Sequence, residues 1–329
     1  ALRSTYSRYQ LYEMMVDFWT NHFNIYIRKN LTGMLKTADD RDVVRKYALG
    51  KFYDILSASA HSPAMMIYLD NFESTKNKPN ENYARELLEL HTLGVDGGYT
   101  QQDVQELARV LTGWGVAGRR GAKPGEFEYR QNIHDTGSKS ILGKKYENNG
   151  QQEGELVLQA LAKHRSTINY VSKKLVRRFV ADDPPQALIA KAAKTFTDSD
   201  GDIPKVMKTL VMSDEFRASL GQKFKRPYEF IISALRVTNA QVDPGRALNN
   251  YLNKQYTQGL APNAKGPQIS FSESSKNPEI KPTENQNIGK TVEEVLGGSE
   301  QLPNTSKGDK QYQKEGGSSQ QDKDFEVLN

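Results

Sequence analysis

The sequence predicts an all-α fold, a multi-helix globular domain with a glycine-rich loop insertion and a polar C-terminal tail. Apolar residues recur at helical spacing through most of residues 1–240, which we interpret as one helical domain. Glycines break this pattern over residues 115–150. Residues 241–329 are rich in Asn, Gln, Ser, Gly, Pro and Lys, and such a composition buries too little apolar surface to order itself. We expect this tail to be extended, with at most a short helix over residues 291–296.

The spacing of the apolar residues and the position of one proline predict the first helices. Residues 9–26 keep helical phase, and residues 41–57 continue the pattern as a second helix. Pro63 is expected to open a third, short helix. The stripe of the first helix consists of Leu11, Met15, Phe18, His22 and Ile25.

Two glycine-closed helices follow, over residues 80–93 and 100–112. Thr100 and Asp103 have the spacing of a capping box, and Gly113 ends the second helix. The glycine-rich region after them is expected to hold a short hairpin near residues 127–129.

Further helices are predicted to the end of the domain. Asp202 is the expected N-cap of the helix over residues 203–212, and Asp198–Asp202 departs from the calcium-binding EF-hand pattern. The other expected helices begin near Gly154 and cover residues 166–180, 186–196 and 227–237. Four cations are placed on the outer surface of the 166–180 helix: Lys173, Lys174, Arg177 and Arg178.

Composition excludes several classes of function. The chain has no cysteine, so disulfides, thiolate nucleophiles and cysteine-ligated metals are absent. No P-loop, dinucleotide fingerprint or nucleophile elbow occurs, and no nucleotide cofactor is expected. Residues 1–6 form no signal peptide, and no apolar run approaches the length of a membrane span. Residues 1–240 carry 35 Lys and Arg against 28 Asp and Glu, but nucleic-acid binding is not expected without a motif.

His22 and His91 each lie on an apolar stripe of their helix. One interpretation is a pair of buried neutral imidazoles that bond to backbone or carboxylate groups. The alternative is that the two helices bring both rings and a carboxylate into one pocket, as an acid/base site or as a site for a divalent metal.

Carboxylates and arginines occupy other faces of the two glycine-closed helices. At 100° per residue, Glu86 shares a face with Arg85 and Glu89, whereas His91 points the opposite way. Arg85 and Glu89 are spaced for an i,i+4 ion pair. Arg85 and Arg109 either form architectural pairs with glutamates or clamp an anion.

His134 and Asp135 are the best single catalytic candidates, because they lie in the glycine-rich region with Lys139 nearby. Lys139 is a candidate anion-binding residue. The structural alternative is that Asp135 caps a turn and His134 packs beneath it.

Four segments carry a family resemblance. They read FWTNHFN at residues 18–24, NENYARELLELHTLG at 80–94, YTQQDVQELARVLTGW at 99–114 and HDTGSKSILG at 134–143. In this order they resemble a bacterial family known as domain of unknown function 1800, and further segments extend the resemblance over roughly residues 7–240.

The resemblance implies a mainly helical protein that is typically exported, hence secreted or periplasmic, and often encoded beside a second uncharacterised exported protein. It implies no established activity. Two hypotheses follow. The first is an acid/base or metal-assisted enzyme acting on an extracellular substrate, whose buried polar site is formed by the candidate residues His22, Glu86, His91, Arg109, His134 and Asp135. The alternative is a non-catalytic helical module that binds an anionic polymer or a partner protein.

Overall fold

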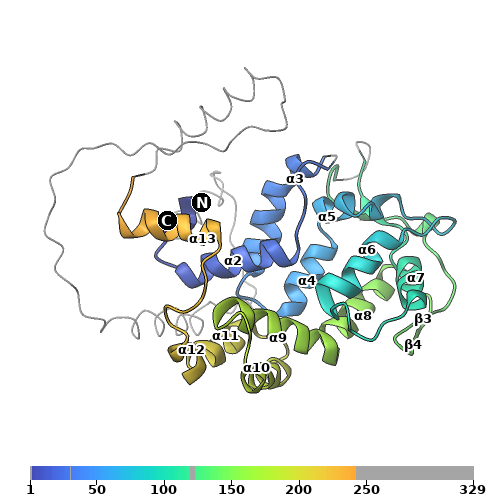
Figure 1. The fold of residues 1–329 in the computed structure, drawn as a ribbon. Coiled ribbons are helices and arrows are strands. Elements are labelled where there is room, and N and C mark those ends of the chain that lie inside the picture. Colours follow the sequence, from blue (N-terminus) through green and yellow to red (C-terminus); the bar gives the residue numbers. More distant parts are fainter. Residues whose placement is uncertain (1, 30, 119–122, 242–329) are drawn as a thin grey trace, which may run out of the picture. The chain divides into compact units, whose positions relative to one another are not determined.

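The computed structural model describes residues 2–29, 31–118 and 123–241, and these form an all-α fold, as predicted (Figure 1). The described residues belong to one compact unit. The predicted tail and its helix over residues 291–296 lie outside the described residues.

Short helices make up the first part of the unit. They are α1 (Leu2–Tyr6), α2 (Gln10–His22), α3 (Thr32–Asp39), the π-helix η1 (Asp40–Arg45), α4 (Phe52–Ala60), α5 (Pro63–Tyr68) and the 3₁₀-helix η2 (Asn71–Glu73).

The middle of the unit combines helices with two small hairpins. Its elements are α6 (Glu81–Glu86), the π-helix η3 (Leu87–Thr92), α7 (Gln101–Val110), β1 (Trp114–Val116), β2 (Phe127–Tyr129), the 3₁₀-helix η4 (Gln131–Ile133), β3 (Lys139–Ile141) and β4 (Lys144–Tyr146).

Helices alone complete the described chain. They are α8 (Gln151–Ala162), α9 (Arg165–Phe179), α10 (Gln186–Asp198), α11 (Ile203–Val211), α12 (Asp214–Ala218) and α13 (Pro227–Val237). In this part α9 packs against both α10 and α11, while α8 packs against α4 (Figure 1).

The prediction of one continuous helix over residues 41–57 is wrong. The chain leaves the helix before Gly50 because residues 50–52 pair with a distant loop. Phe52 N donates to Gly201 O at 2.9 Å, and Ile203 N donates to Gly50 O at 3.2 Å. The backbone groups that form these two hydrogen bonds cannot also form the hydrogen bonds of an α-helix. α4 therefore starts only at Phe52.

The capping box is confirmed at the start of α7. Thr100 Oγ1 accepts from Asp103 N at 3.2 Å, and Thr100 N donates to Asp103 Oδ2 at 2.7 Å. After α7 the chain turns at Gly113, whose φ is +82°, and a Cβ there would lie 2.6 Å from Arg130 O. Only glycine fits this approach without a shift of the backbone.

The glycine-rich region holds two hairpins. The predicted one is present, with β2 paired antiparallel to β1. The second, β3 with β4, was not predicted; in it Lys139 lies opposite Tyr146. This second hairpin lies beside α7, because Leu142 N donates to Asp103 Oδ1 at 2.6 Å and Ser140 N donates to Glu106 Oε2 at 3.1 Å.

Candidate functional site

Three buried ionisable residues form one group, the carboxylate–histidine cluster, defined as His134, Lys139 and Glu153. His134 follows η4, Lys139 begins β3 and Glu153 lies in the first turn of α8. Glu153 Oε2 lies 3.0 Å from Lys139 Nζ and 3.3 Å from His134 Nε2. Each of the three side chains is at most 1% exposed. A charge at this depth needs a partner, and here the ammonium and carboxylate charges compensate each other.

The hydrogen bonds of His134 fix where its protons lie. Its Nδ1 is 2.8 Å from Thr112 O, which only accepts, so Nδ1 carries a hydrogen. The Thr112 hydroxyl cannot donate a hydrogen to Nδ1, because its own hydrogen is donated to Arg109 O at 2.6 Å. The hydrogen bond between His134 Nε2 and Glu153 Oε2 therefore needs a second proton, which lies either on Nε2 or on the Glu153 carboxyl group. His134 and Glu153 form a proton-sharing pair.

The other oxygen of Glu153 is free for a further contact. Oε1 is buried and has no hydrogen-bond partner among the described residues, and the same holds for the Tyr129 hydroxyl. Burial raises the pKa of Tyr129, and the charge of Glu153 raises it further. Both atoms are exceptions to the rule that buried polar groups are hydrogen-bonded, and the unpartnered oxygen of Glu153 suits a ligand hydroxyl that can donate to it.

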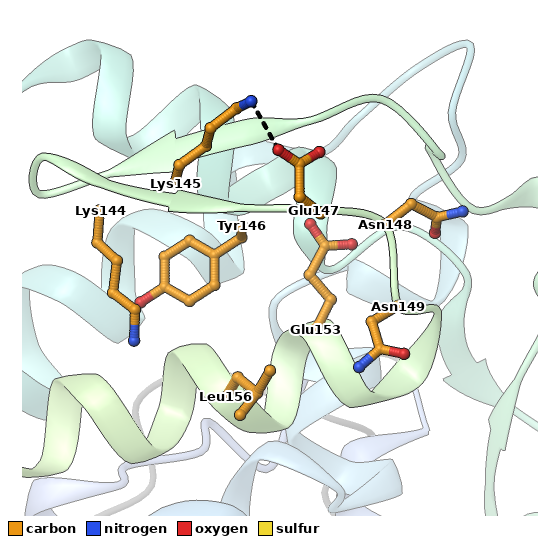
Figure 2. A pocket seen from close by; sticks show the side chains of 8 residues that line it. All are labelled: Lys144, Lys145, Tyr146, Glu147, Asn148, Asn149, Glu153 and Leu156. Atoms are coloured by element: carbon orange, nitrogen blue, oxygen red, sulfur yellow. Dashed lines mark ion pairs between the residues drawn. The ribbon is translucent and has the colours of Figure 1, made fainter.

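Glu153 also lines an open pocket of about 320 Å³ between the second hairpin and α8. Figure 2 shows Glu153 and Leu156 projecting from α8, with the Tyr146 ring and Glu147 on the hairpin side. Glu147 differs from Glu153 in being exposed and paired with Lys145 at 2.6 Å. The hydrogen bond from Lys145 and its positive charge lower the pKa of Glu147. The remaining lining residues are Lys144, Asn148 and Asn149.

Asp135 lies beside the cluster but belongs to a bridge with Arg109. Arg109 Nε donates to Asp135 Oδ2 at 2.9 Å, and its Nη2 donates to Oδ1 at 3.1 Å. Burial alone would raise the pKa of Asp135, but the hydrogen bonds from Arg109 and Gly137 N lower it. Arg109 Nη1 also bonds Glu106 at 2.9 Å, so this guanidinium is occupied. The bridge ties α7 to the turn after His134.

A second group, the lysine–histidine cluster, consists of His22, His91, Tyr170 and Lys174. Lys174 Nζ donates to His22 Nδ1 at 2.8 Å, and His22 Nε2 donates to His91 O at 3.0 Å. The two rings are 6.3 Å apart. Lys174 Nζ lies 5.2 Å from the centre of the Tyr170 ring.

Burial controls the protonation of the lysine–histidine cluster. It lowers the pKa of His91 to about 3, with a further contribution from Lys174. Burial, then Lys174 and His91, place the pKa of His22 well below its ordinary value. Burial also lowers the pKa of Lys174 to about 8. Both imidazoles are therefore neutral near pH 7, as the first of the two interpretations requires.

The sequence profile of a family described as "Protein of unknown function (DUF1800)" matches residues 1–266. The chain belongs to this family. No curated protein and no solved structure matches the chain. The two clusters are thus the available guide to the chemistry of this DUF1800 chain.

The two clusters of the DUF1800 chain are separate. Among the described residues, no hydrogen bond or ring contact joins His22 or His91 to His134. Glu86 belongs to neither cluster. It is half-buried on the opposite face of the α6–η3 segment from His91, as predicted. Burial and the neighbouring Glu89 raise the pKa of Glu86.

Two predictions about surface charges of the DUF1800 chain are wrong. Arg85 pairs with Glu81 at 3.1 Å rather than with Glu89, and it also bonds Gln101 at 2.8 Å. Of the four cations predicted on the outer surface of α9, only Lys173 and Arg177 are exposed. Lys174 points toward His22, and Arg178 pairs with Asp17 and Glu229. This side of α9 is therefore covered by an imidazole and two carboxylates from other helices.

Neither a metal-binding cluster nor a membrane-spanning helix occurs in the part of the DUF1800 chain that the structure describes. Within residues 2–29, 31–118 and 123–241, no three His, Asp or Glu side chains gather closely enough to hold a metal ion. In the same residues, no helix has the length and apolar character needed to cross a bilayer.

Sequence reasoning missed Glu153 and Tyr170 as members of the two clusters, did not single out Tyr129 beside them, and gave Lys174 a different role. Glu153 lies at the start of an ordinary amphipathic helix, where an acidic residue is common. Tyr129 belongs to the expected hairpin, but nothing in the pattern marks its hydroxyl as buried. Lys174 was placed on the exposed face, although its spacing of four from Tyr170 was visible in the sequence.

Proposed function

We propose that this chain is an acid/base enzyme in which Glu153 transfers a proton to or from a neutral, hydroxyl-bearing substrate bound in the pocket between β4 and α8. One observation carries the proposal. Glu153 is fully buried and lines the pocket, with one oxygen in the proton-sharing pair and the other without a partner. A carboxylate so placed has both a source of protons and a vacant acceptor.

The proposed chemistry uses the two oxygens of Glu153 differently. Oε1 accepts the proton of a substrate hydroxyl. Oε2 exchanges a proton with His134 Nε2, and Lys139 stabilises the carboxylate form. Transfer in the opposite direction makes Glu153 a general acid. Each role requires hydrogen-bond contact with the substrate.

Glu147 is the proposed second carboxylate of the site. It comes from the hairpin side of the pocket, whereas Glu153 comes from α8 (Figure 2). Lys145 favours its ionised form, while Glu153 shares a proton with His134. Two carboxylates in contrasting environments are the usual basis for one acid and one base in hydrolytic sites. This supports hydrolysis of a neutral glycan as the reaction to test first.

The test compares wild-type protein with Glu153→Gln on a panel of neutral oligosaccharides, with products separated by chromatography. Glu155→Gln is the matched control. Glu155 lies two residues later on α8 and also bonds a histidine, His61, at 2.8 Å, but does not line the pocket. We expect Glu153→Gln to lose at least about 100-fold in rate and Glu155→Gln to stay active.

Binding is measured in parallel through the methyl resonances of Leu156. Shifts in wild-type protein that vanish in Glu153→Gln would support the proposal. The proposal would be contradicted if Glu153→Gln and Glu155→Gln were equally active. It would also be contradicted if no oligosaccharide of the panel shifted the Leu156 methyl resonances. If anionic polymers instead bind in a salt-sensitive way that depends on Lys173 and Arg177, the non-catalytic binding module is the better description.

Export and a partner encoded nearby are the remaining parts of the proposal, and they rest on the family resemblance. Cell fractionation with an antibody against the protein tests export. Recovery in the cytoplasm alone would contradict it.

A further inference from the structure

Among the carboxylates of the described residues, none neutralises the amine of Lys174. Among the described residues it forms no ion pair, and the polar atom it contacts is His22 Nδ1 at 2.8 Å. Buried or half-buried lysines normally lie against a carboxylate, as Lys139 does against Glu153. The absence of such a partner among the described residues separates Lys174 from an architectural lysine.

The surroundings of Lys174 hold the amine in one orientation. His22 Nε2 donates to His91 O, so its Nδ1 is the acceptor and can take one N–H of Lys174. The Tyr170 ring lies against the amine at 5.2 Å. Tyr170 in turn packs closely on Gly94, since a Cβ added to Gly94 would lie 2.8 Å from the nearest atom of the Tyr170 ring.

We propose that Lys174 is a carbonyl-reactive site that forms an imine with an aldehyde or ketone ligand. His22 acts as its positioning residue. The site is distinct from the pocket at Glu153 and does not depend on the function proposed there.

The step balances without an oxidant or reductant. The lone pair of neutral Lys174 Nζ attacks the carbonyl carbon, a C–N bond forms, and the carbonyl oxygen takes a proton to give a carbinolamine. Loss of that oxygen as water then leaves the C=N bond. His22 Nδ1 accepts an N–H of the amine and so directs the lone pair elsewhere.

The electrostatics of the cluster favour the neutral amine. Burial lowers the pKa of Lys174 to about 8. The titratable groups against it are the neutral rings of His22 and His91 and the phenol of Tyr170. Glu89 acts on Tyr170, whose pKa burial and Glu89 both raise. Desolvation of this kind is a known way to activate a lysine nucleophile.

The experiment treats the full chain with benzaldehyde and cyanoborohydride, which traps the imine as a stable secondary amine. Peptide mapping by mass spectrometry then gives the rate for each lysine. Lys173, the exposed neighbour on α9, is the internal control. At pH 7 we expect Lys174 to react at least about tenfold faster than Lys173, since an ordinary lysine with a pKa near 10.4 is almost entirely protonated there.

The pH profile and one variant complete the test. The Lys174 rate should level off above about pH 8, whereas the Lys173 rate should keep rising toward pH 10. His22→Leu should reduce the Lys174 rate alone. If Lys174 in wild-type protein reacts no faster than Lys173, the proposal is overturned, whether or not the variant folds.

Discussion

His22 and His91 couple the stability of the protein to acid. Both are buried with lowered pKa values, that of His91 to about 3. In the unfolded chain they take up a proton near pH 6.5. Between pH 6.5 and about 3 the unfolded state therefore binds more protons than the folded state, and stability falls as the pH falls.

For His91 the expected slope is about 1.4 kcal/mol of lost unfolding free energy per pH unit between pH 6.5 and about 3, and His22 changes stability in the same direction. Urea unfolding between pH 7 and pH 4 measures it. His91→Leu should remove the contribution of His91 to the slope in this window, and His22 keeps its hydrogen bond because the acceptor is the backbone oxygen of residue 91. An unchanged slope in His91→Leu would show that other groups cause the acid sensitivity.

Lys139 offers a second test, on the cost of breaking a buried ion pair. Lys139→Met leaves the Glu153 carboxylate buried beside His134 without its ammonium partner. The expected loss is about 3–5 kcal/mol of unfolding free energy. Lys144→Met, on the exposed surface of the same hairpin, should change it by less than about 0.5 kcal/mol. Chemical denaturation of both variants at pH 7 distinguishes these outcomes.

Single candidate residues were predicted better than their partners. Local sequence marked His134, Asp135 and Lys139 because they lie close together in a glycine-rich segment. Glu153 lies 14 positions after Lys139, in a different element, and reaches the cluster only through the packing of α8. Pairings that depend on tertiary packing leave no periodic signal in the chain.

Two glycines with the same backbone conformation give a matched test of helix packing. Gly94 and Gly98 both have φ near +87°. A Cβ on Gly94 would lie 2.8 Å from the Tyr170 ring, whereas a Cβ on Gly98 meets nothing within 4 Å. Gly98→Ala should cost about 1–2 kcal/mol for the left-handed conformation alone.

Gly94→Ala should cost more than Gly98→Ala, because Tyr170 on α9 must move as well. Thermal unfolding of the two variants measures the difference. Equal losses would mean that the contact between Gly94 and Tyr170 contributes little to the packing of η3 on α9.

Helix periodicity predicted most elements but not their irregularities. The burial of Ala84, Leu87, Leu88 and His91 agrees with the predicted apolar face, although the segment becomes a π-helix at Leu87. A π-turn differs from an α-turn by one residue, too little to alter the apolar pattern over two turns. The break at Gly50 was missed for another reason, since its hydrogen-bond partners lie 150 residues away.

Arg178 connects segments from the two ends of the described chain. It pairs with Asp17 on α2 at 3.2 Å and with Glu229 on α13, and Arg226 also contacts both carboxylates. Arg178→Met should therefore release α13 first. Hydrogen exchange should become faster in residues 227–237 while α4 and α5 keep their protection.

Arg177→Met is the control for this prediction. Arg177 is exposed on the same helix, and its loss should leave exchange in α13 unchanged. Equal effects of the two variants would assign the change to the net charge of α9 rather than to the contacts of Arg178. The sequence could not predict these contacts, because Asp17 and Glu229 lie 161 and 51 positions from Arg178 along the chain.

The positions of the two tryptophans make the ultraviolet emission of the protein a local optical signal. Both indoles are fully buried. Trp19 lies edge-on to His22 at 5.4 Å, and Trp114 packs against α8 at Gly154, the residue after Glu153. Since the whole sequence contains two tryptophans, Trp114→Phe leaves Trp19 as the single tryptophan emitter, and Trp19→Phe leaves Trp114. Each variant reports on one cluster by fluorescence, with no dye attached.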